Sequence, residues 1–448
     1  MKRTIGHPAH SRAYVMTHLA THSTSLAHGR TGFIPLFALA LGILILATAP
    51  PAAAFESTWG VTVDGSMGLT YAGHQEDNDP TYALTTALWS RSLFPLTSGG
   101  SMELAAQGSY TWTDDRPYLF DLDLLRLSSR HPGLAGDSSV VRTSLGRFPF
   151  RDTTGIVLSH LADGAQIRLN YPGVRVRVAG AYTGLLLNPS SDIRMTLADL
   201  ADGGDDDELL GPARVIALGE IAFPEMIARQ TVTAGLSGQY DLRDADDDEA
   251  TLHTGYLSLG VAGPLVANLY HDLSGTMMLG RSELDDESED LMGFMADARL
   301  RYFRSDLYST RIGLRFTWAS GAGDDLDRFV PISRSTAGTI LTLPIENLMR
   351  GEFSYSMRPV APVQVGYTIG WFFIADKEDL PDAVGVNPDP DGRWLGTEVT
   401  ARVATRITSD LGLVITGGVF APSSGENGVF TGAREAEYLL RVEVSTGL

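Results

Sequence analysis

Apolar and polar residues alternate along most of the chain after residue 54, and the segment 310–319 (TRIGLRFTWA) shows the pattern most clearly. Apolar side chains occupy every second position from Ile312 to Trp318, and Arg311 and Arg315 lie on the opposite face. A period of two predicts a β-strand whose two faces meet different surroundings. The apolar face ends in aromatic residues, just before a small polar turn and an acidic loop. This order is expected of a strand that crosses a membrane and ends at its aqueous boundary.

The same alternation recurs through the rest of the chain and predicts eighteen strands. None of these segments is a run of about 20 apolar residues, the length that a membrane-spanning helix requires. The predicted strands are 57–71, 80–91, 100–113, 117–130, 138–148, 163–171, 173–185, 213–223, 230–242, 251–262, 264–280, 291–304, 306–319, 350–359, 362–374, 395–408, 411–420 and 435–446.

The links between these strands alternate in length and charge. Tight turns follow mostly the even-numbered strands, at 171–173, 263–264, 305–306, 359–362 and 409–410. Long polar loops, several of them acidic, follow the odd-numbered strands, for example at 73–80, 188–212, 243–249, 281–290 and 375–393. Outer-membrane barrels have short turns on the periplasmic side and long loops outside. The predicted fold class is therefore all-β: a transmembrane antiparallel β-barrel of 18 strands with short periplasmic turns and long acidic extracellular loops.

Arginine residues occupy the polar face of several predicted strands, opposite the apolar face. An Arg at the bilayer midplane costs about 2–4 kcal/mol on a barrel surface, so this face must look into the lumen. Guanidinium groups bind carboxylates and phosphates in a bidentate way and keep their charge. The predicted pore-lining residues are Arg168, Arg175, Arg177, Arg299, Arg301, Arg311, Arg315, Arg402 and Arg406. Each of them could select anions, or could instead pair with a lumenal acid and brace the barrel, for example with Asp121, Asp123, Asp297, Glu398 or Glu443.

The N-terminal 54 residues differ from the rest. Arg30 precedes an uninterrupted apolar run at 33–48, and the small residues of Ala-Pro-Pro-Ala-Ala-Ala follow it. A basic flank, a short apolar core and small residues before a cleavage site are typical of a secretory signal peptide. We therefore expect residues 1–54 to be a presequence with a signal peptide cleaved after Ala54, and residues 55–448 to be the barrel. A retained membrane anchor is the alternative.

Composition and charge narrow the function further. The chain has 34 basic and 54 acidic residues, a formal net charge of −20, and no cysteine. The negative balance argues against a nucleic-acid partner, and the missing cysteine excludes disulfides and thiolate metal sites. Beyond residue 54 the only lysine is Lys377, so the cations of the predicted strands are arginines.

The final strand carries a further signal. In the segment 435–448 (EAEYLLRVEVSTGL), Tyr438, Leu440, Val442 and Val444 share one face. This resembles the C-terminal signal by which the barrel-assembly machinery recognises outer-membrane barrels. The usual last residue of that signal is aromatic, and Leu448 departs from it. An ordinary amphipathic strand is the alternative reading.

Short motifs between residues 140 and 422 resemble the alginate-export-type family of outer-membrane barrels. They comprise Leu145-Gly146-Arg147 with Asp152, Gly155, Asp163-Gly164 and Arg168; Ala319-Ser320-Gly321 with Asp324, Phe329 and Pro331; Asn347-Leu348; Leu395-Gly396-Thr397-Glu398; and the segment 408–422. The resemblance implies an 18-stranded barrel that conducts an anionic polysaccharide through an Arg-rich lumen. Extra residues in the loop after Ser320 and the absence of lysine from the strands depart from the family pattern.

Together these features predict a porin-like channel in the outer membrane of a bacterial cell. The expected partners are outer-membrane lipid, the barrel-assembly machinery and an anionic or small polar solute, including an anionic oligo- or polysaccharide. The loop 320–349 or 186–212 could form the constriction. The alternative is a structural or adhesive surface barrel that binds partners through its acidic loops. We expect no enzyme activity, cofactor or metal site, because no nucleophile, phosphate-loop or metalloprotease motif is present.

Overall fold

The computed structural model describes residues 55–72, 79–97, 99–114, 116, 118–203, 208–243, 250–284, 287–323, 326–380, 385–425, 428–432 and 434–447. The predicted presequence and signal peptide at 1–54 and the final residue Leu448 lie outside them, as do the acidic runs 73–78, 204–207 and 244–249.

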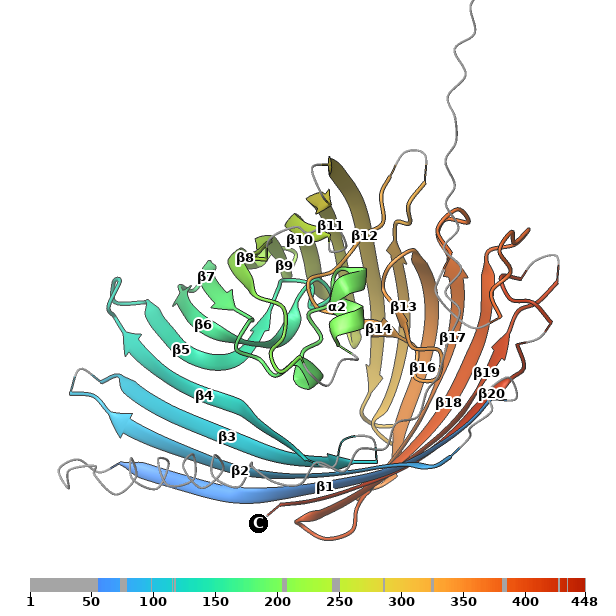
Figure 1. Ribbon diagram of the computed structural model, residues 1–448. Helices are drawn as coiled ribbons and strands as arrows, with labels where there is room; N and C mark the ends of the chain where they lie inside the picture. Colours follow the sequence, from blue (N-terminus) through green and yellow to red (C-terminus); the bar gives the residue numbers. More distant parts are fainter. Residues whose placement is uncertain are drawn as a thin grey trace, which may run out of the picture. The chain divides into compact units, whose positions relative to one another are not determined.

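Within the described residues, one antiparallel sheet holds eighteen strands, which confirms the predicted fold class. The first strand pairs with both the second and the last, so the sheet closes into a barrel, and Figure 1 shows the strands running around it in chain order. The strands are β1 (Glu56–Ala72), β2 (Thr81–Pro95), β3 (Ser101–Thr113), β4 (Leu119–Pro132), β5 (Val140–Arg151), β6 (Ser159–Asn170), β7 (Arg175–Tyr182), β8 (Arg214–Ile227), β9 (Gln230–Asp241), β10 (Thr251–Val266), β11 (Leu269–Leu284), β12 (Glu287–Arg304), β13 (Thr310–Ala319), β16 (Leu348–Val360), β17 (Val363–Ile374), β18 (Trp394–Arg406), β19 (Leu411–Pro422) and β20 (Glu437–Gly447).

Most strand boundaries differ by a few residues from the prediction, and two differences change how a link is described. The turn expected at Gly263–Pro264 lies further along, because β10 continues to Val266 through an irregularity at Pro264 and the chain reverses at Asn268, whose φ is +67°. A bulge lets a strand absorb a proline without ending. The acidic segment 281–290 was predicted as a loop, but β11 and β12 pair through most of it, from Arg281↔Asp290 to Leu284↔Glu287. Charged residues remain compatible with a strand where both of its faces are exposed to water.

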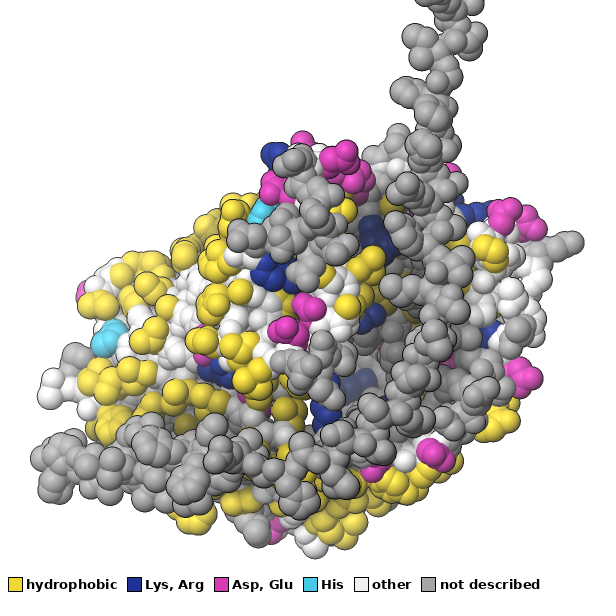
Figure 2. Space-filling view, in the orientation of Figure 1, with side chains coloured by type: hydrophobic (Ala, Val, Ile, Leu, Met, Phe, Trp, Pro, Cys, Tyr) yellow, Lys and Arg dark blue, Asp and Glu magenta, His cyan; other side chains and the backbone are white. Residues whose placement is uncertain are grey.

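The outer wall is apolar. Large hydrophobic side chains remain exposed along every part of it, such as Leu145 at 59%, Leu259 at 58% and Leu314 at 50%. Figure 2 shows hydrophobic side chains over the outside of the wall and Lys and Arg side chains in the hollow. A soluble protein rarely leaves apolar surface of this extent uncovered, so this wall is suited to contact with lipid.

Two links fold into the barrel instead of extending from it (Figure 1). The first, residues 183–213, carries the 3₁₀ turn η1 (Asn188–Ser190) and the helix α2 (Leu197–Asp202). The second, residues 320–347, carries the short paired strands β14 (Thr336–Ala337) and β15 (Leu343–Pro344). We refer to them as the inward helical segment and the inward hairpin segment. In the described part of the chain, no helix is long and apolar enough to cross a membrane.

The apolar core lies inside the barrel, where the inward segments pack on the wall and on each other. Phe329, Ile332 and Ile345 of the inward hairpin segment are fully or almost fully buried, together with Ile193 of the inward helical segment and Val157 of the β5–β6 link. Backbone hydrogen bonds join these pieces: Ser333 donates to the Val157 carbonyl at 3.1 Å, and Arg334 donates to the Asp192 carbonyl at 2.7 Å. The two links proposed as constrictions therefore both occupy the lumen.

A buried ion cluster holds α2 in place. Arg214 of β8 has no exposed surface, and its guanidinium contacts Asp199 of α2 and Asp241 of β9, each at 2.8 Å. Arg243 adds a second contact to both acids at 2.8 Å. Two arginines against two buried acids balance their charges, which makes burial of the cluster tolerable. The helix is thereby anchored to the strands β8 and β9.

Candidate functional site

The arginines that the sequence predicts to line the pore lie on the inward-facing positions of their strands and fall into three groups. Arg299 and Arg315 contact one buried acid. Arg301, Arg311 and Arg402 line a cavity. The members of the third group, Arg168, Arg175, Arg177 and Arg406, lie elsewhere on the wall.

Asp297 of β12 binds the first group. Its carboxylate accepts hydrogen bonds from Arg299 and Arg315, both at 2.6 Å, and from the Thr317 hydroxyl at 2.7 Å. Asp297 is only 4% exposed. Burial of an ionised carboxylate requires partners of this kind. Both arginines therefore pair with a lumenal acid, which is the alternative that the sequence left open for each of them, and Arg315 braces β13 against β12.

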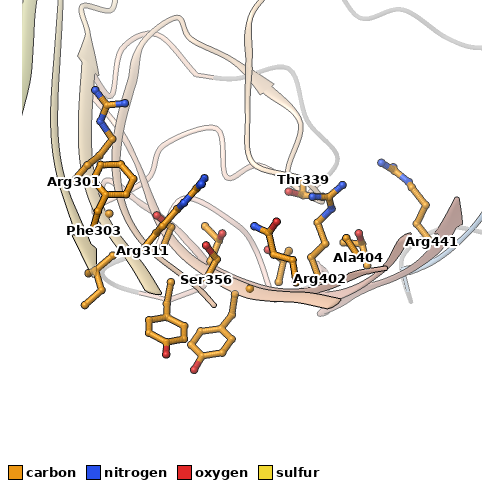
Figure 3. A pocket seen from close by; sticks show the side chains of 18 of the residues that line it. Arg301, Phe303, Arg311, Thr339, Ser356, Arg402, Ala404 and Arg441 are labelled. Atoms are coloured by element: carbon orange, nitrogen blue, oxygen red, sulfur yellow. The ribbon is translucent and has the colours of Figure 1, made fainter. Parts of the chain in front are cut away.

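The second group lines a cavity of about 580 Å³ in the part of the lumen bounded by β12 to β20. Arg301, Arg311 and Arg402 extend into it from β12, β13 and β18, and Arg441 joins them from β20. Figure 3 shows the four guanidinium groups directed away from the wall and into the cavity. We call this space the basic cavity.

The side chains of the basic cavity leave its positive charge largely uncompensated. Among the residues that the structure describes, none of its four arginines forms an ion pair, and Glu443 is the only acid that lines it. Arg311 lies over the Phe303 ring at 5.7 Å, a contact that orients a cation without neutralising it. The remaining lining is rich in neutral hydrogen-bonding groups: Thr339, Ser354, Ser356, Gln364, Thr368, Thr400 and Thr416.

The tip of the inward hairpin segment reaches this cavity through Thr339 and is fixed to the wall by Glu398. The Glu398 carboxylate accepts N–H groups from Thr339, Ile340 and Leu341 at distances of 2.8 to 3.1 Å. Gly338 has φ +85°, and a Cβ there would lie 3.0 Å from the Glu398 carboxylate. Glu398, which the sequence suggested as an arginine partner, therefore binds backbone N–H groups of the narrowing segment instead.

The third group is arranged differently. Arg177 of β7 pairs with Glu220 of β8 at 2.7 Å. Arg168 of β6 donates to the Gln166 side chain at 3.1 Å and has no acidic partner among the described residues. Arg175 lies two positions before Arg177, toward the periplasmic turn, and Arg406 lines a separate surface recess at the β18–β19 turn.

An acidic recess of about 310 Å³ lies on another arc of the inner wall. Asp64 of β1 and Asp121 and Asp123 of β4 line it, together with hydroxyl and amide side chains. Asp121 is 3.6 Å from the buried Arg147, which also binds Asp163 at 2.7 Å. The Arg147–Asp163 pair belongs to the motif that resembles the alginate-export type.

A glycine of unusual conformation precedes the buried Arg147 in β5. In a regular strand Leu145 and Arg147 would share a face, but Leu145 is 59% exposed on the outer wall and Arg147 is 7% exposed. Gly146 lies between them with φ +112°, and a Cβ there would lie 2.0 Å from the Leu125 carbonyl oxygen. Only glycine adopts this backbone without strain, so Gly146 permits the close approach of β5 to β4 at this point.

Among the described residues, no group of three or more His, Asp and Glu side chains could hold a metal ion. Ser159 and His160 are neighbours on one strand, so their side chains point to opposite faces. His160 instead accepts a hydrogen bond from the Asp192 N–H at 3.3 Å.

The sequence prediction missed Arg441. Its position was readable, because Arg441 and Glu443 lie opposite the apolar face Tyr438–Val444 of the last strand. The sequence gives no sign that the last strand lines the same cavity as β12 and β13. That arrangement depends on the curved wall from β12 to β20, which encloses the cavity.

Comparison with known proteins gives structural neighbours only. No protein-family model and no curated protein matches the chain. Among solved structures, it is similar to Pseudomonas aeruginosa OccK2 (OpdF), with TM-score 0.55 and 13% identity over 88% of this chain and 98% of that one. It is also similar to OpdO of the same organism, with TM-score 0.54 and 14% identity over 88% and 97%.

A third similar structure is OccK2 in complex with glucuronate, with TM-score 0.54 and 14% identity over 87% of this chain and 98% of that one. These neighbours are outer-membrane porins. At such identities the likeness concerns the fold: an 18-stranded porin barrel. It does not single out the alginate-export type.

Proposed function

We propose that the chain is an outer-membrane channel through which small anionic solutes pass by diffusion. The basic cavity carries the proposal. Four arginines from four strands face one water-accessible space, without acidic partners among the described residues, beneath the tip of an inward segment. Rings of charged side chains set ion preference in pores, and unpaired guanidinium groups attract carboxylates and phosphates.

The wall chemistry supports a weakly bound, polar solute. The hydroxyl and amide groups among the arginines, such as Ser354, Gln364 and Thr400, can exchange hydrogen bonds with a hydroxylated molecule. Conduction requires that binding be strong enough for entry and weak enough for release. A small carboxylate suits these groups, and the complex of OccK2 with glucuronate is consistent with this class. Passage of an anionic oligosaccharide would require the same charges.

Several finer features belong to the same proposal. We propose residues 1–54 as a presequence whose signal peptide is removed, and the last strand as a signal for the barrel-assembly machinery. The apolar outer wall then faces outer-membrane lipid. We also propose an alginate-export type of barrel, on the resemblance of the motif that contains Gly146, which gives no substrate. We propose no catalytic role.

One observation favours the alternative, a structural or adhesive barrel. The inward segments bury an apolar core within the lumen, and such a core could plug the pore. Recording from purified, folded protein in planar bilayers separates the two functions. Stepwise currents are expected for the channel, and their absence would refute it.

Anion preference is tested by reversal potentials in a salt gradient. Replacement of Arg301, Arg402 and Arg441 by glutamine is expected to shift the reversal potential toward cation preference. A matched control replaces three exposed arginines near the strand ends, Arg281, Arg304 and Arg358. If the control shifts the potential as much as the cavity variant, general charge rather than the basic cavity sets the preference.

A further inference from the structure

A groove of about 580 Å³ lies on the outer wall of the barrel, on the side away from the lumen. It is lined by Leu273 of β11, Leu314 and Phe316 of β13 and Trp371 of β17, all of them exposed. Gly351 of β16 lies between Phe316 and Trp371 in the register of the strands, so no side chain separates the two rings. We call this space the outer groove.

Charged residues contribute only main chain to the outer groove. Arg299, Arg315 and Glu352 are among its lining residues, but they occupy the alternate positions of their strands, whose side chains face the lumen. There Arg299 and Arg315 bind Asp297, and Glu352 contacts Arg350. All but one of the other side chains that line the groove are apolar.

The exception lies at the end of the groove nearest the periplasmic turns. His271 of β11 is opposite Gly263 of β10, and the Gln230 side chain of β9 covers that glycine, where a Cβ would lie 2.3 Å from the Gln230 Oε1. Gln230 Nε2 donates to the Pro264 carbonyl at 2.7 Å. Gln230 Oε1 and His271 Nδ1 are buried and have no hydrogen-bond partner among the described residues. Unsatisfied polar groups on a lipid-facing wall are costly, so the protein alone does not satisfy this end of the groove.

A cation lies beside these two groups. Arg229 is in the turn between β8 and β9, and its carbonyl oxygen would lie 2.9 Å from a Cβ at Gly263. Its side chain is exposed and forms no ion pair within the part of the chain that the structure describes, Glu225 of the same turn included. We call Arg229, Gln230 and His271 the polar end. The apolar groove thus terminates in one cation and two hydrogen-bonding side chains.

We propose that the outer groove is a binding site for one phospholipid, with an acyl chain in the groove and an anionic headgroup at the polar end. The groove crosses β11, β12, β13, β16 and β17, which are four strand spacings or about 19 Å. One leaflet is half of a hydrocarbon core about 30 Å thick, so an acyl chain has the length to lie along the groove. Guanidinium binds phosphate, and imidazole and amide groups form hydrogen bonds with a headgroup.

The chemistry of the site favours a phospholipid over a second copy of this chain. The outer wall of a second barrel would bring apolar side chains to Arg229, whereas a phospholipid brings a phosphate. The groove is also continuous with the apolar wall that is suited to contact with lipid. Because the site is on the outside of the barrel, the inference goes beyond the proposed channel and does not depend on passage through the lumen.

Native mass spectrometry of the folded barrel in detergent, with added dioleoylphosphatidylglycerol, tests the groove. We expect the unaltered protein to retain one lipid. Gly351→Leu fills the groove and should weaken binding about tenfold or more, since a Cβ at Gly351 meets only Trp371, at 3.6 Å. The matched control is Gly275→Leu, on the same face of β11 as Leu273 but outside the groove, where a Cβ meets nothing closer than 4.0 Å. It should bind the lipid as the unaltered protein does.

The polar end is tested by charge. Dioleoylphosphatidylcholine, which has no net charge, should bind about fivefold more weakly than the anionic lipid, and Arg229→Gln should remove this preference. Arg358→Gln removes an exposed arginine from the turn between β16 and β17 and should leave the preference unchanged.

Every outcome decides. No retained lipid in the unaltered protein, or equal binding by Gly351→Leu and Gly275→Leu, overturns the groove as the site. Equal effects of Arg229→Gln and Arg358→Gln overturn the polar end. A mass of two barrels that Gly351→Leu reduces to one, without loss of lipid, overturns the inference in favour of a second copy. If Gly351→Leu does not fold, Ala298→Leu fills the same groove from β12. Conductance is measured separately, so absent currents would refute the channel and leave the lipid site intact.

Discussion

Single arginines of the inner wall differ in what their guanidinium groups touch, and this difference decides their roles. Arg315 is hydrogen-bonded to the buried Asp297, whereas Arg301 extends into the basic cavity without an acidic partner among the described residues. The sequence places both on the same face of adjacent strands, and pattern alone cannot separate them.

Arg315→Gln should destabilise the barrel, because Asp297 then loses one of its charged partners while it stays buried. We expect a loss of about 1.5–3 kcal/mol, the range for a hydrogen bond to a charged group. Arg301→Gln should leave stability unchanged and alter anion preference instead. Urea unfolding in lipid vesicles measures the first effect, and reversal potentials measure the second. Equal stability losses for the two variants would contradict the distinction between a bracing Arg315 and a cavity-lining Arg301.

Glu346 gives the inward hairpin segment a pH dependence. Burial raises the pKa of its carboxyl to about 7, although Arg328 at 4.0 Å and Arg334 oppose that rise. Asp379, which Arg328 binds, faces the same site and adds to the rise. The folded state therefore favours protonated Glu346. Its stabilisation is complete below the unfolded pKa of 4.5 and is lost as pH rises through about 7.

We accordingly expect the unaltered protein to have a lower thermal transition midpoint at pH 8.5 than at pH 5.5. The isosteric variant Glu346→Gln, which stays neutral, should remove most of this difference. Thermal scans followed by tryptophan fluorescence measure it. A pH dependence that persists undiminished in Glu346→Gln would show that other groups cause it.

Among the elements, the inward hairpin segment occupies the lumen, and two sets of hydrogen bonds hold its tip and its neck. Glu398 binds the tip at three backbone N–H groups. Asn347 fixes the neck, because its side chain donates to the Asp376 carbonyl at 2.9 Å and accepts the Asp376 N–H at 2.6 Å. A segment bound at both ends narrows the pore steadily rather than opening and closing.

Glu398→Ala should release the tip, since four hydrogen bonds to one carboxylate are lost together. Larger and noisier single-channel currents are expected, with no change in the barrel's strands. Glu352→Ala is a control, because Glu352 also lies on the inner wall but contacts Arg350 rather than the tip. Currents as steady as those of the unaltered protein would mean that Glu398 does not hold the segment.

The strand β5 depends on one glycine. Gly146→Val adds a branched side chain at φ +112°, where a Cβ would meet the Leu125 carbonyl at 2.0 Å. Backbone strain of this kind costs roughly 1–3 kcal/mol, so the yield of folded barrel should fall. Gly219→Val, where a Cβ meets nothing within 4 Å, is the matched control. Heat-modifiable migration in gels reports the folded fraction, and equal yields would contradict a special role for Gly146.

For the whole molecule, the division between an apolar exterior and a charged interior determines where the protein can reside. Leu314→Arg places a charge on the outer wall of β13 and should lower stability in lipid by about 2–4 kcal/mol if the position is near the midplane. Ser356→Arg places the same charge on the inner wall of β16 and should cost much less. Unfolding in lipid vesicles compares the two, and equal costs would refute the assignment of faces.

The architecture and the faces of the strands could be predicted because they depend on local information. Side chains alternate between the two faces of a strand, so the sequence of each strand indicates which of its side chains face the lumen. The length of a link between strands indicates at which end of the barrel it lies, because periplasmic turns are short and outer loops are long. Strand boundaries were less predictable, and most differ by a few residues from those of the structure. The local signals misled most at Pro264, where a bulge continued the strand, and at 281–290, where charged residues stayed in the ladder.

The partners of the inner-wall residues could not be predicted, because contacts across a closed barrel join residues distant in the chain. Glu398 binds the tip at 339–341 only because the inward hairpin segment crosses the lumen. Asp297 binds Arg315 because the register of β12 and β13 places the two side chains near each other. Arg441 joins Arg301 because the curved wall from β12 to β20 encloses one cavity. The alternation in the chain establishes which residues face inward, and tertiary packing alone decides which of those arginines are left free to meet an anion.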